Sequence, residues 1–395
     1  MAGKIYELFI SARSFLPSLT RIYNMHNIIV FFTKGGDSDM QKSKCTCSVT
    51  LFLFAIAASL SSTPAGAVGP PNNTAYVNAA TGNNANVPCP VTAPCADLNT
   101  ALSVISAGGS VYIIGPGIFG PVNITAQVNI SGTDPSAYVE IFANPAATPG
   151  CVGATPGNCG PNSGFAVDVE AGSTDVVKLG HLLFATTGIG TGAVKVGSGN
   201  VISMTHDVFR GNSTTTGPIV NIVPSGSAHT EIYMSNGDIA FNRNGGAVLI
   251  QASGTNNTAL HFNHMEVHHA TFGIKTDASG LTGPANTNSI NTFVSESEFF
   301  SFSGSAVTAL SAVGSGGVHS VYNNVNVLNS GGPAVNANGP GSFVILTNST
   351  LGGNQTGVRS INNATVISSV NNTIKGNGTD ISVSAGGQFL PQALQ

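Results

Sequence analysis

The sequence predicts an all-β fold, a right-handed parallel β-helix with three short strands in each coil and a short N-terminal capping helix. A pattern of apolar residues recurs every 24 to 32 residues from residue 176 onward, a period typical of solenoids. The apolar segments are short, are separated by Gly and Asn, and lack helical periodicity. Only 8% of residues are charged, Gly numbers 49 and Trp is absent. Such a composition leaves little of the charged surface that helices of α/β enzymes carry.

Each coil is predicted to contribute three apolar segments to the interior. The first contains an anchor residue, the second has an apolar residue five positions later, and the third follows a Gly-containing corner. Because alternate strand residues face opposite sides, these apolar positions should point inward and stack from coil to coil. The anchors are Leu179, Met204, Met234, Phe262, Val294, Tyr322, Leu346 and Val370. The second row is Phe184, Phe209, Ile239, Val267, Phe299, Val327, Leu351 and, one position early, Ile374. The third segments are residues 194–196, 220–222, 248–250, 274–276, 307–309, 335–337, 358–360 and 381–383.

Two corners per coil are rich in Asn. Asn tolerates the left-handed backbone that sharp turns need, and its amide can bond to neighbouring backbone or to the next coil. Two residues past the anchors stand His181, His206, Asn236, His264, Glu296, Asn324, Asn348 and Asn372. Eight residues past them stand Asn212, Asn242, Ser330 and Asn354.

The chain is predicted to have five parts. Residues 1–39 precede a complete signal and indicate a start annotated too early, with Met40 the initiator. Residues 40–67 have the basic start, apolar run and small-residue cleavage site of a signal peptide. The apolar run is shorter than the ~20 residues of a membrane span, which favours cleavage over the alternative of a retained anchor. The remaining parts are 68–109 (strand, disulfide loop and capping helix), 110–385 (β-helix) and 386–395 (an irregular tail).

We therefore expect an exported protein that is periplasmic, at the cell surface or extracellular, with no membrane span after cleavage. Four cysteines remain, in two close pairs: Cys89 with Cys95, and Cys151 with Cys159. In an exported protein such pairs are expected to form disulfides. Zinc is the alternative, but neither pair has two-residue spacing and no His lies near them in sequence.

From residue 68 onward, seven Lys and Arg face 14 Asp and Glu, a net charge of −7. An acidic surface repels phosphate, so nucleic acid is not an expected partner.

Three stretches have a familiar pattern: the segment beginning AYVNAATGNN, DVVKLGHLLF at the first clear coil, and SVNNTIKGNGTDI near the end. They resemble a family of exported bacterial right-handed parallel β-helix proteins with the pectate-lyase-like (pectin lyase-like) fold, over about residues 73–385. The resemblance implies the fold. It implies little about activity, because this fold carries lyases, hydrolases, esterases, adhesins and phage spikes.

Signatures of the enzymes with this fold are missing from the sequence. The nearest matches to the polygalacturonase motifs G-H-G and R-I-K are Gly180-His181, without a following Gly, and residues 273–275 (GIK). The R-x-P-x-x-R context of pectate lyases does not occur around Arg210, Arg243 or Arg359.

The register nevertheless gathers chemically capable side chains on one outward face. Four positions past the anchors, Asp238, Glu266 and Glu298 should stack as a carboxylate row; two positions further stand Arg210, Ala240, His268 and Phe300. Stacked carboxylates repel each other, so they could share a Ca²⁺ or act as general acid and base for glycosidic cleavage. The alternative is a hydrated acidic surface that binds nothing specific.

Residues 261–269 (HFNHMEVHH) are rich in His, but the register disperses them over strand, corner and second segment, which argues against one metal site. A glycan groove would use aromatic rings, and Phe300 is the one ring that we expect outward beside the carboxylates, unless it packs under a loop.

The sequence thus favours a non-catalytic exported scaffold or a binder of polysaccharide or cell-surface glycan. The alternative is a polysaccharide lyase or glycoside hydrolase that uses Asp238, Glu266, Glu298, His268 and Arg210, with Ca²⁺ as a candidate cofactor.

Overall fold

The structure is a computed structural model that describes residues 72–133, 139–142, 164–186, 191–227, 229–284, 287–369 and 371–392. The expected upstream extension, the expected signal peptide and the Cys151–Cys159 pair lie outside the described residues. The compact unit that begins at Ala67 is described below by itself.

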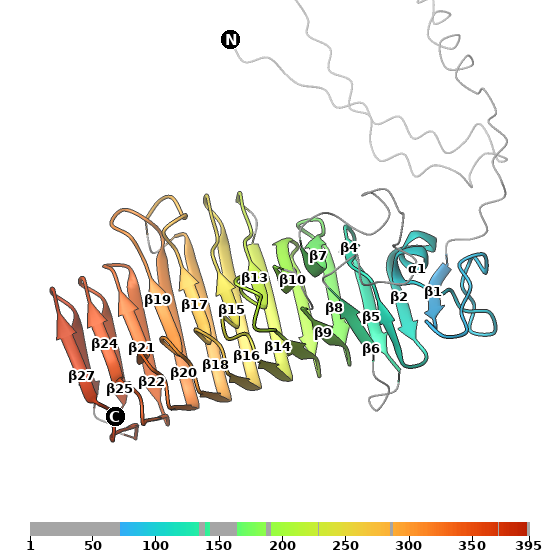
Figure 1. Cartoon of the computed structure of the whole chain (residues 1–395). Coiled ribbons are helices and arrows are strands. Elements are labelled where there is room, and N and C mark those ends of the chain that lie inside the picture. The colour runs from blue at the N-terminus through green and yellow to red at the C-terminus, as the bar shows by residue number, and fades with distance from the viewer. Residues whose placement is uncertain are drawn as a thin grey trace, which may run out of the picture. The chain divides into compact units, whose positions relative to one another are not determined.

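This unit is a right-handed parallel β-helix, as the sequence predicts (Figure 1). Two strand segments of each regular coil belong to an 18-stranded sheet and the third belongs to a 10-stranded sheet. The larger sheet contains β1 (Asn72–Val77), β2 (Ile105–Ile113), β3 (Gly117–Phe119), β5 (Val128–Gly132), β6 (Val139–Phe142), β8 (Val176–Gly180), β9 (Leu183–Ala185), β11 (Val201–Thr205), β12 (Val208–Arg210), β14 (His229–Ala240), β16 (Asn257–His268), β18 (Ser289–Phe300), β20 (Gly317–Leu328), β22 (Ser342–Thr347), β23 (Thr350–Gly352), β25 (Thr365–Ser369), β26 (Thr373–Ile374) and β28 (Gln388–Gln392). The smaller sheet contains β4 (Val122–Ile124), β7 (Phe165–Glu170), β10 (Gly192–Ser198), β13 (Val220–Ile222), β15 (Val248–Ile250), β17 (Ile274–Asp277), β19 (Val307–Leu310), β21 (Pro333–Asn338), β24 (Thr356–Ile361) and β27 (Thr379–Ser384).

The predicted register is confirmed for seven anchors. The parallel pairing of the larger sheet aligns each anchor from Leu179 to Leu346 with the next. The second row is aligned throughout, up to the pair Leu351 and Ile374. The eighth anchor is wrong: Leu346 pairs with Ser368 and not with Val370. The interval from Ser368 to Ile374 is one residue longer than that from Leu346 to Leu351, so the fixed spacing does not predict the register here.

The first corner is a left-handed residue in every coil from β8 to β22. A single residue in this conformation bends the chain sharply, and β14, β16, β18 and β20 each run through the corner as one 12-residue strand. The positive φ angles are those of His181 (58°), His206 (58°), Asn236 (55°), His264 (49°), Glu296 (49°), Asn324 (55°) and Asn348 (51°).

The second corner turns one residue earlier than predicted. Phe241, His269 and Ser301, seven past the anchor, have φ of 65°, 55° and 62°. The predicted corner residue Asn242 instead points inward, is fully buried, and its amide donates to the carbonyls of Gly217 and Gly246. The amide therefore satisfies buried backbone across the corner.

A row of polar side chains lies inside the first corner, three positions past the anchor. Ser297 Oγ accepts a hydrogen bond from the backbone N–H of Met265 (3.1 Å), in the preceding coil. Asp207 Oδ1 likewise accepts a hydrogen bond from the backbone N–H of Leu182, at 2.9 Å. Asp207 is 1% exposed, and burial raises the pKa of its carboxyl well above the ordinary value, against two backbone hydrogen bonds that lower it. A carboxyl thus stands where another coil uses a hydroxyl.

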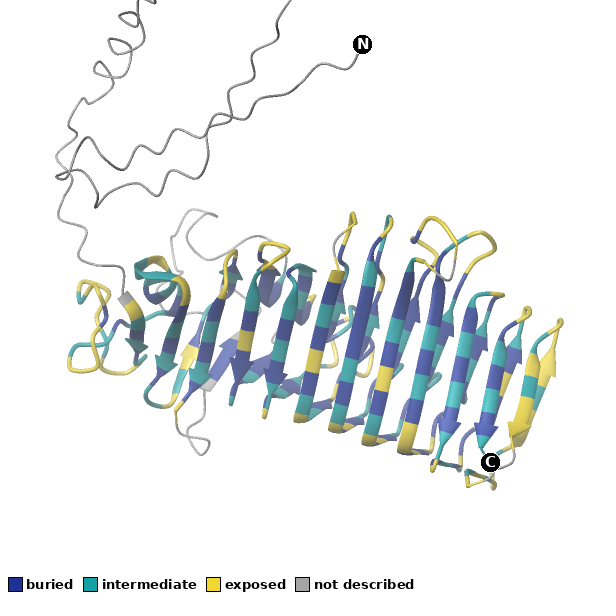
Figure 2. Ribbon diagram, turned by 180° about the vertical axis from the view of Figure 1, so that it is seen from behind, coloured by how far each residue is buried: buried dark blue, intermediate teal, exposed yellow. Residues whose placement is uncertain are grey.

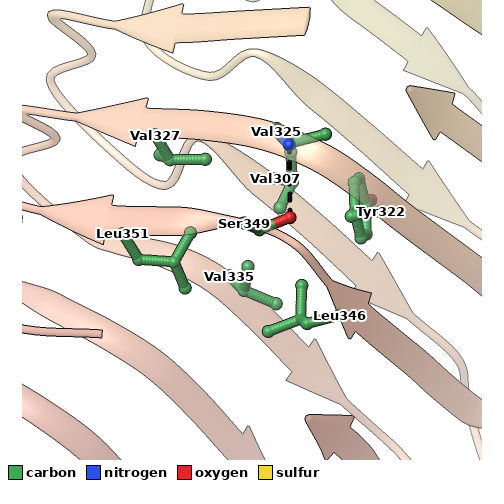
Figure 3. A pocket seen from close by; sticks show the side chains of 8 residues that line it. All are labelled: Val307, Tyr322, Val325, Val327, Val335, Leu346, Ser349 and Leu351. Carbon is green, nitrogen blue, oxygen red and sulfur yellow. Dashed lines mark hydrogen bonds between the residues drawn. The ribbon is translucent and has the colours of Figure 1, made fainter. Parts of the chain in front are cut away.

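The interior is filled by apolar side chains, and Figure 2 shows buried and part-exposed residues alternating along the larger sheet. Phe184 and Phe209 stack at 5.0 Å between ring centroids. The space drawn in Figure 3, between Tyr322, Val325 and Ser349, lies inside this core and admits no water molecule. It is a packing gap and not a ligand site.

The N-terminal end is covered by α1 (Leu98–Val104), within the predicted helical segment. Asp97 begins the helix, and its Oδ1 accepts from Thr100 N at 2.7 Å, as an N-cap does. The predicted disulfide between Cys89 and Cys95 is present in the preceding loop. Within the described ranges, no helix is long and apolar enough to span a membrane.

The C-terminal segment differs from the predicted irregular tail. β28 pairs in parallel with β25 and adds a further rung. Residues 386–387 (GG) make the turn that returns the chain to the larger sheet, since Gly386 has a φ of 77°.

Candidate functional site

The carboxylate row forms as predicted from the register. Asp238 pairs with Glu266, and Glu266 with Glu298, on three consecutive coils. The three side chains do not converge on one point: the side chain of Asp238 is 24% exposed, whereas that of Glu266 is 53% exposed and Glu298 is exposed as well. The row therefore lies on an open face, and its first member is set apart from the other two.

Asp238 turns toward the neighbouring outward row. Its Oδ2 lies 2.5 Å from Nη1 of Arg210, and its Oδ1 lies 3.3 Å from Nε2 of His268. Strand pairing explains the proximity, since Arg210, Ala240 and His268 stand in register on β12, β14 and β16. Ala240 is small enough to let Arg210 and His268 approach Asp238 from the coils on either side.

His268 has a lowered pKa, which favours its neutral form at neutral pH. Burial lowers its pKa, and this outweighs the nearby carboxylate of Asp238, which raises it. The ring stacks on Phe300 with centroids 4.8 Å apart and planes within 2°. Its Nδ1 lies 2.6 Å from Nδ1 of His269, so one ring donates and the other accepts. Phe300 thus packs on a ring of the neighbouring strand β16 and not under a loop, which was the alternative expected for it.

Phe241, at the second corner of the coil that contains Asp238, packs against the residues around His268. Its ring stacks on His269 at 5.5 Å and receives Cζ of Arg210 at 5.7 Å from its centroid. The guanidinium is thereby fixed by a carboxylate on one side and an aromatic face on another.

The His-rich segment is dispersed, as the register predicts. His264 lies at the first corner, where its Nε2 is 2.6 Å from Oε2 of Glu296, while His268 lies on the second segment. Among the residues that the structure describes, no three His, Cys, Asp or Glu side chains are grouped as ligands of a metal ion. Binding of Ca²⁺ by the carboxylate row therefore gains no support from the geometry.

Sequence reasoning missed an aromatic row on the other outward face. Tyr233, His261 and Phe293, each one residue before an anchor, stack with centroids 4.5 and 5.1 Å apart and planes within 7° and 16°. Tyr233 is 37% exposed and Phe293 44% exposed. Their positions beside the anchors predict this row, because a strand residue next to an inward anchor must face outward.

Glu231 fixes the first ring of the aromatic row. The Tyr233 hydroxyl donates to its Oε2 (2.6 Å), and Nε2 of His229 lies 2.9 Å from its Oε1. These hydrogen bonds lower the pKa of Glu231, and the carboxylate raises the pKa of Tyr233. The phenol stays protonated and its ring is held flat against His261.

A shallow hollow lies at the first corner between the two faces. It has a volume of about 280 Å³. We call this depression the corner hollow. It is lined by His264, Glu296, Ser297, Glu298, Asn324 and Asn326.

No protein-family model, no curated protein and no solved structure matches this chain. Its function is therefore inferred from the side chains of these faces. Aromatic rings, carboxylates and amides gather on the coils of β14, β16 and β18, and this combination suits polar ligands that also present apolar faces.

Proposed function

We propose that the protein is an exported β-helix of the pectate-lyase-like group that binds a glycan without cleaving it. In this proposal the N-terminal segment is a cleaved signal peptide, and the mature protein acts in the periplasm, at the cell surface or outside the cell. The observation that supports glycan binding is the aromatic row in which exposed Tyr233 and Phe293 flank the half-buried His261.

Aromatic side chains serve glycan binding because sugar rings present C–H groups that pack against apolar aromatic surface. Exposed aromatic side chains in a contiguous patch commonly mark a binding surface. The rings stack face to face from coil to coil, so a ligand chain that lies along the row would contact successive ring edges. Neighbouring carboxylates and amides supply partners for sugar hydroxyls. Nucleic acid, which also stacks on rings, is disfavoured by the excess of carboxylates.

Affinity electrophoresis through gels that contain neutral, amino-bearing or uronic-acid polysaccharides tests the proposal. We expect at least one polysaccharide to retard the protein. The Tyr233→Ala/Phe293→Ala variant should lose the retardation, whereas Leu328→Ala, which trims another exposed apolar residue one coil further on, should keep it. If no polysaccharide retards the protein, or if both variants behave alike, glycan binding by this row is wrong.

A second candidate function rests on the contacts of Asp238. A carboxylate 3.3 Å from a neutral imidazole and 2.5 Å from a guanidinium could support proton transfer in a lyase or hydrolase. The measurement is release of reducing ends or unsaturated products, with and without Ca²⁺, by the wild type and by Asp238→Asn and Glu266→Gln. Cleavage that either variant abolishes would replace the non-catalytic proposal.

A further inference from the structure

We propose that the C-terminal end of the β-helix is a dimer interface, in which β27 of one copy pairs antiparallel with β27 of a second copy about a two-fold axis at Ser382. The smaller sheet then continues from one copy into the other. The interface is separate from the proposed glycan-binding surface, which lies on β14, β16 and β18.

The first step is that the last coil leaves its apolar interior uncovered. Ile381 and Val383 are 43% and 46% exposed. One coil earlier, Val358 and Ser360 stand in register with them and are fully buried. Figure 2 shows exposed residues gathered on the last strands, and β27 is the terminal strand of the smaller sheet. This end therefore presents the surface that each earlier coil covers with the next coil.

The second step is the direction of the backbone groups at this edge. In the earlier coils, the inward residues of the smaller sheet bond to the coil that follows: Val220 donates its N–H to it at 2.9 Å, and the carbonyl of Val196 accepts from it at 2.8 Å. Ile381 continues the row of Val220, and Val383 continues the row of Val196. By the same register, the N–H and C=O groups of Ile381 and Val383 point to the free edge.

The third step is that this edge is complementary to itself. About a two-fold axis at Ser382, Ile381 of one copy lies opposite Val383 of the second copy. The N–H and C=O groups of these two residues then bond to each other, as in a hydrogen-bonded antiparallel pair. Their inward side chains cover one another across the junction. Asp380 lies opposite Ser384 of the second copy, so the pairing brings no two carboxylates together.

The fourth step excludes an open-ended stack of copies. The N-terminal end is closed by α1, whose Leu98 and Ala101 are buried against the core, so a C-terminal end finds no matching edge there. Pro391, at an inward position of β28, has no N–H to give to a further strand of the larger sheet. The open edge of β27 is therefore matched by the same edge of another copy.

The spiral of the last coil also fits a two-fold axis. β26, β27 and β28 follow one another along the chain on the three sides of the coil and pair with β23, β24 and β25. An axis through β27 exchanges the sides of β26 and β28. The strand that extends furthest, β28, then lies over the side on which the second copy stops first, at β26.

Analytical ultracentrifugation of the full chain tests the interface. We expect a dimer and no larger species. Val383→Lys places a charge on each side of the junction and should raise the dissociation constant about tenfold or more. Val313→Lys makes the same change at a residue that is 89% exposed between β19 and β20, and this matched control should leave the dissociation constant unchanged.

Oxidative cross-linking tests the two-fold axis itself. Ser382→Cys places two thiols at the axis, where the Cα atoms of a non-hydrogen-bonded antiparallel pair are ~4.5 Å apart and within disulfide range. Asp380→Cys, on the same strand, lies opposite Ser384 of the second copy and is the matched control. We expect non-reducing electrophoresis to show a disulfide-linked dimer for Ser382→Cys well above that of the wild type and of Asp380→Cys.

Three results would overturn the proposal. A monomer at every concentration would show that a second copy does not cover this end. A series of larger species, or a dimer that Val383→Lys and Val313→Lys leave equally tight, would place the contact elsewhere. Equal cross-linking of Ser382→Cys and Asp380→Cys would contradict the two-fold axis at Ser382.

Discussion

The rings of Tyr233 and His261 lie 4.5 Å apart and within 7° of parallel, on the outer surface of consecutive coils. Phe293 continues the stack at 5.1 Å from His261. Stacking along a solenoid follows from register: identical positions of adjacent coils lie one strand spacing apart, so planar side chains align face to face. The same repetition that stabilises the fold thereby arranges a repeating row of ring edges at the surface.

Replacement of Asp207 tests the buried carboxyl at the first corner. Its pKa is raised in the folded state, so its contribution to stability is present below the ordinary carboxyl pKa and is lost as the pH rises through the folded value. We expect the urea midpoint of the wild type to fall, relative to Asp207→Asn, as the pH is raised from about 4 to 8.

Asp207→Ser is the matched control, because Ser297 and Ser349 accept the corresponding backbone hydrogen bonds in other coils. Its midpoint should follow that of Asp207→Asn with pH. Parallel pH profiles for the wild type and both variants would show that Asp207 does not titrate in this way.

Replacement of His206 tests the left-handed corner, where its φ is 58°. His206→Val should destabilise the protein by about 1 to 2 kcal/mol, because a β-branched residue is strained in this conformation. His206→Asn should have little effect, since Asn occupies the same corner at Asn236, Asn324 and Asn348. Equal unfolding free energies for the two variants would refute the assignment of strain to this corner.

Removal of the Lys195 charge should destabilise the smaller sheet. Its Nζ lies 3.1 Å from Oδ1 of Asp168 and 2.6 Å from Oε1 of Glu170. Burial lowers the pKa of Lys195, but the two hydrogen-bonded carboxylates together raise it above the ordinary value. Asp168 is only 3% exposed, so Lys195→Met leaves a buried carboxylate without its cation.

The expected loss is roughly 1 to 3 kcal/mol in urea unfolding, moderated by the partial exposure of Lys195. Lys275→Met is the control, because Lys275 occupies the same outward row three coils along the sheet. A loss of the same size in both variants would mean that the Asp168 contact adds nothing.

The repeat made much of the fold predictable. Inward residues such as Leu179, Met204 and Met234 recur in register, and the same count placed Asp238, Glu266 and Glu298 in one row. Where the length of a coil changes, a fixed residue spacing no longer predicts the register, as at the last anchor, where Leu346 pairs with Ser368.

The site was predictable only in part, because side-chain contacts depend on rotamers and on neighbours of different size. The sequence aligned Asp238 with Glu266, but its preference for Arg210 and His268 follows from the small Ala240 between them. The aromatic row follows from the same register, because Tyr233, His261 and Phe293 each stand next to an inward anchor and must face outward.

Hydroxyl-radical footprinting of the protein with and without its retained polysaccharide tests the central claim most directly. We predict that the glycan protects Tyr233 and Phe293 and leaves Val313 and Leu390, which are exposed elsewhere on the solenoid, unchanged. Protection confined to other surfaces, with Tyr233 and Phe293 as reactive as in the free protein, would contradict the assignment of the binding surface to β14, β16 and β18.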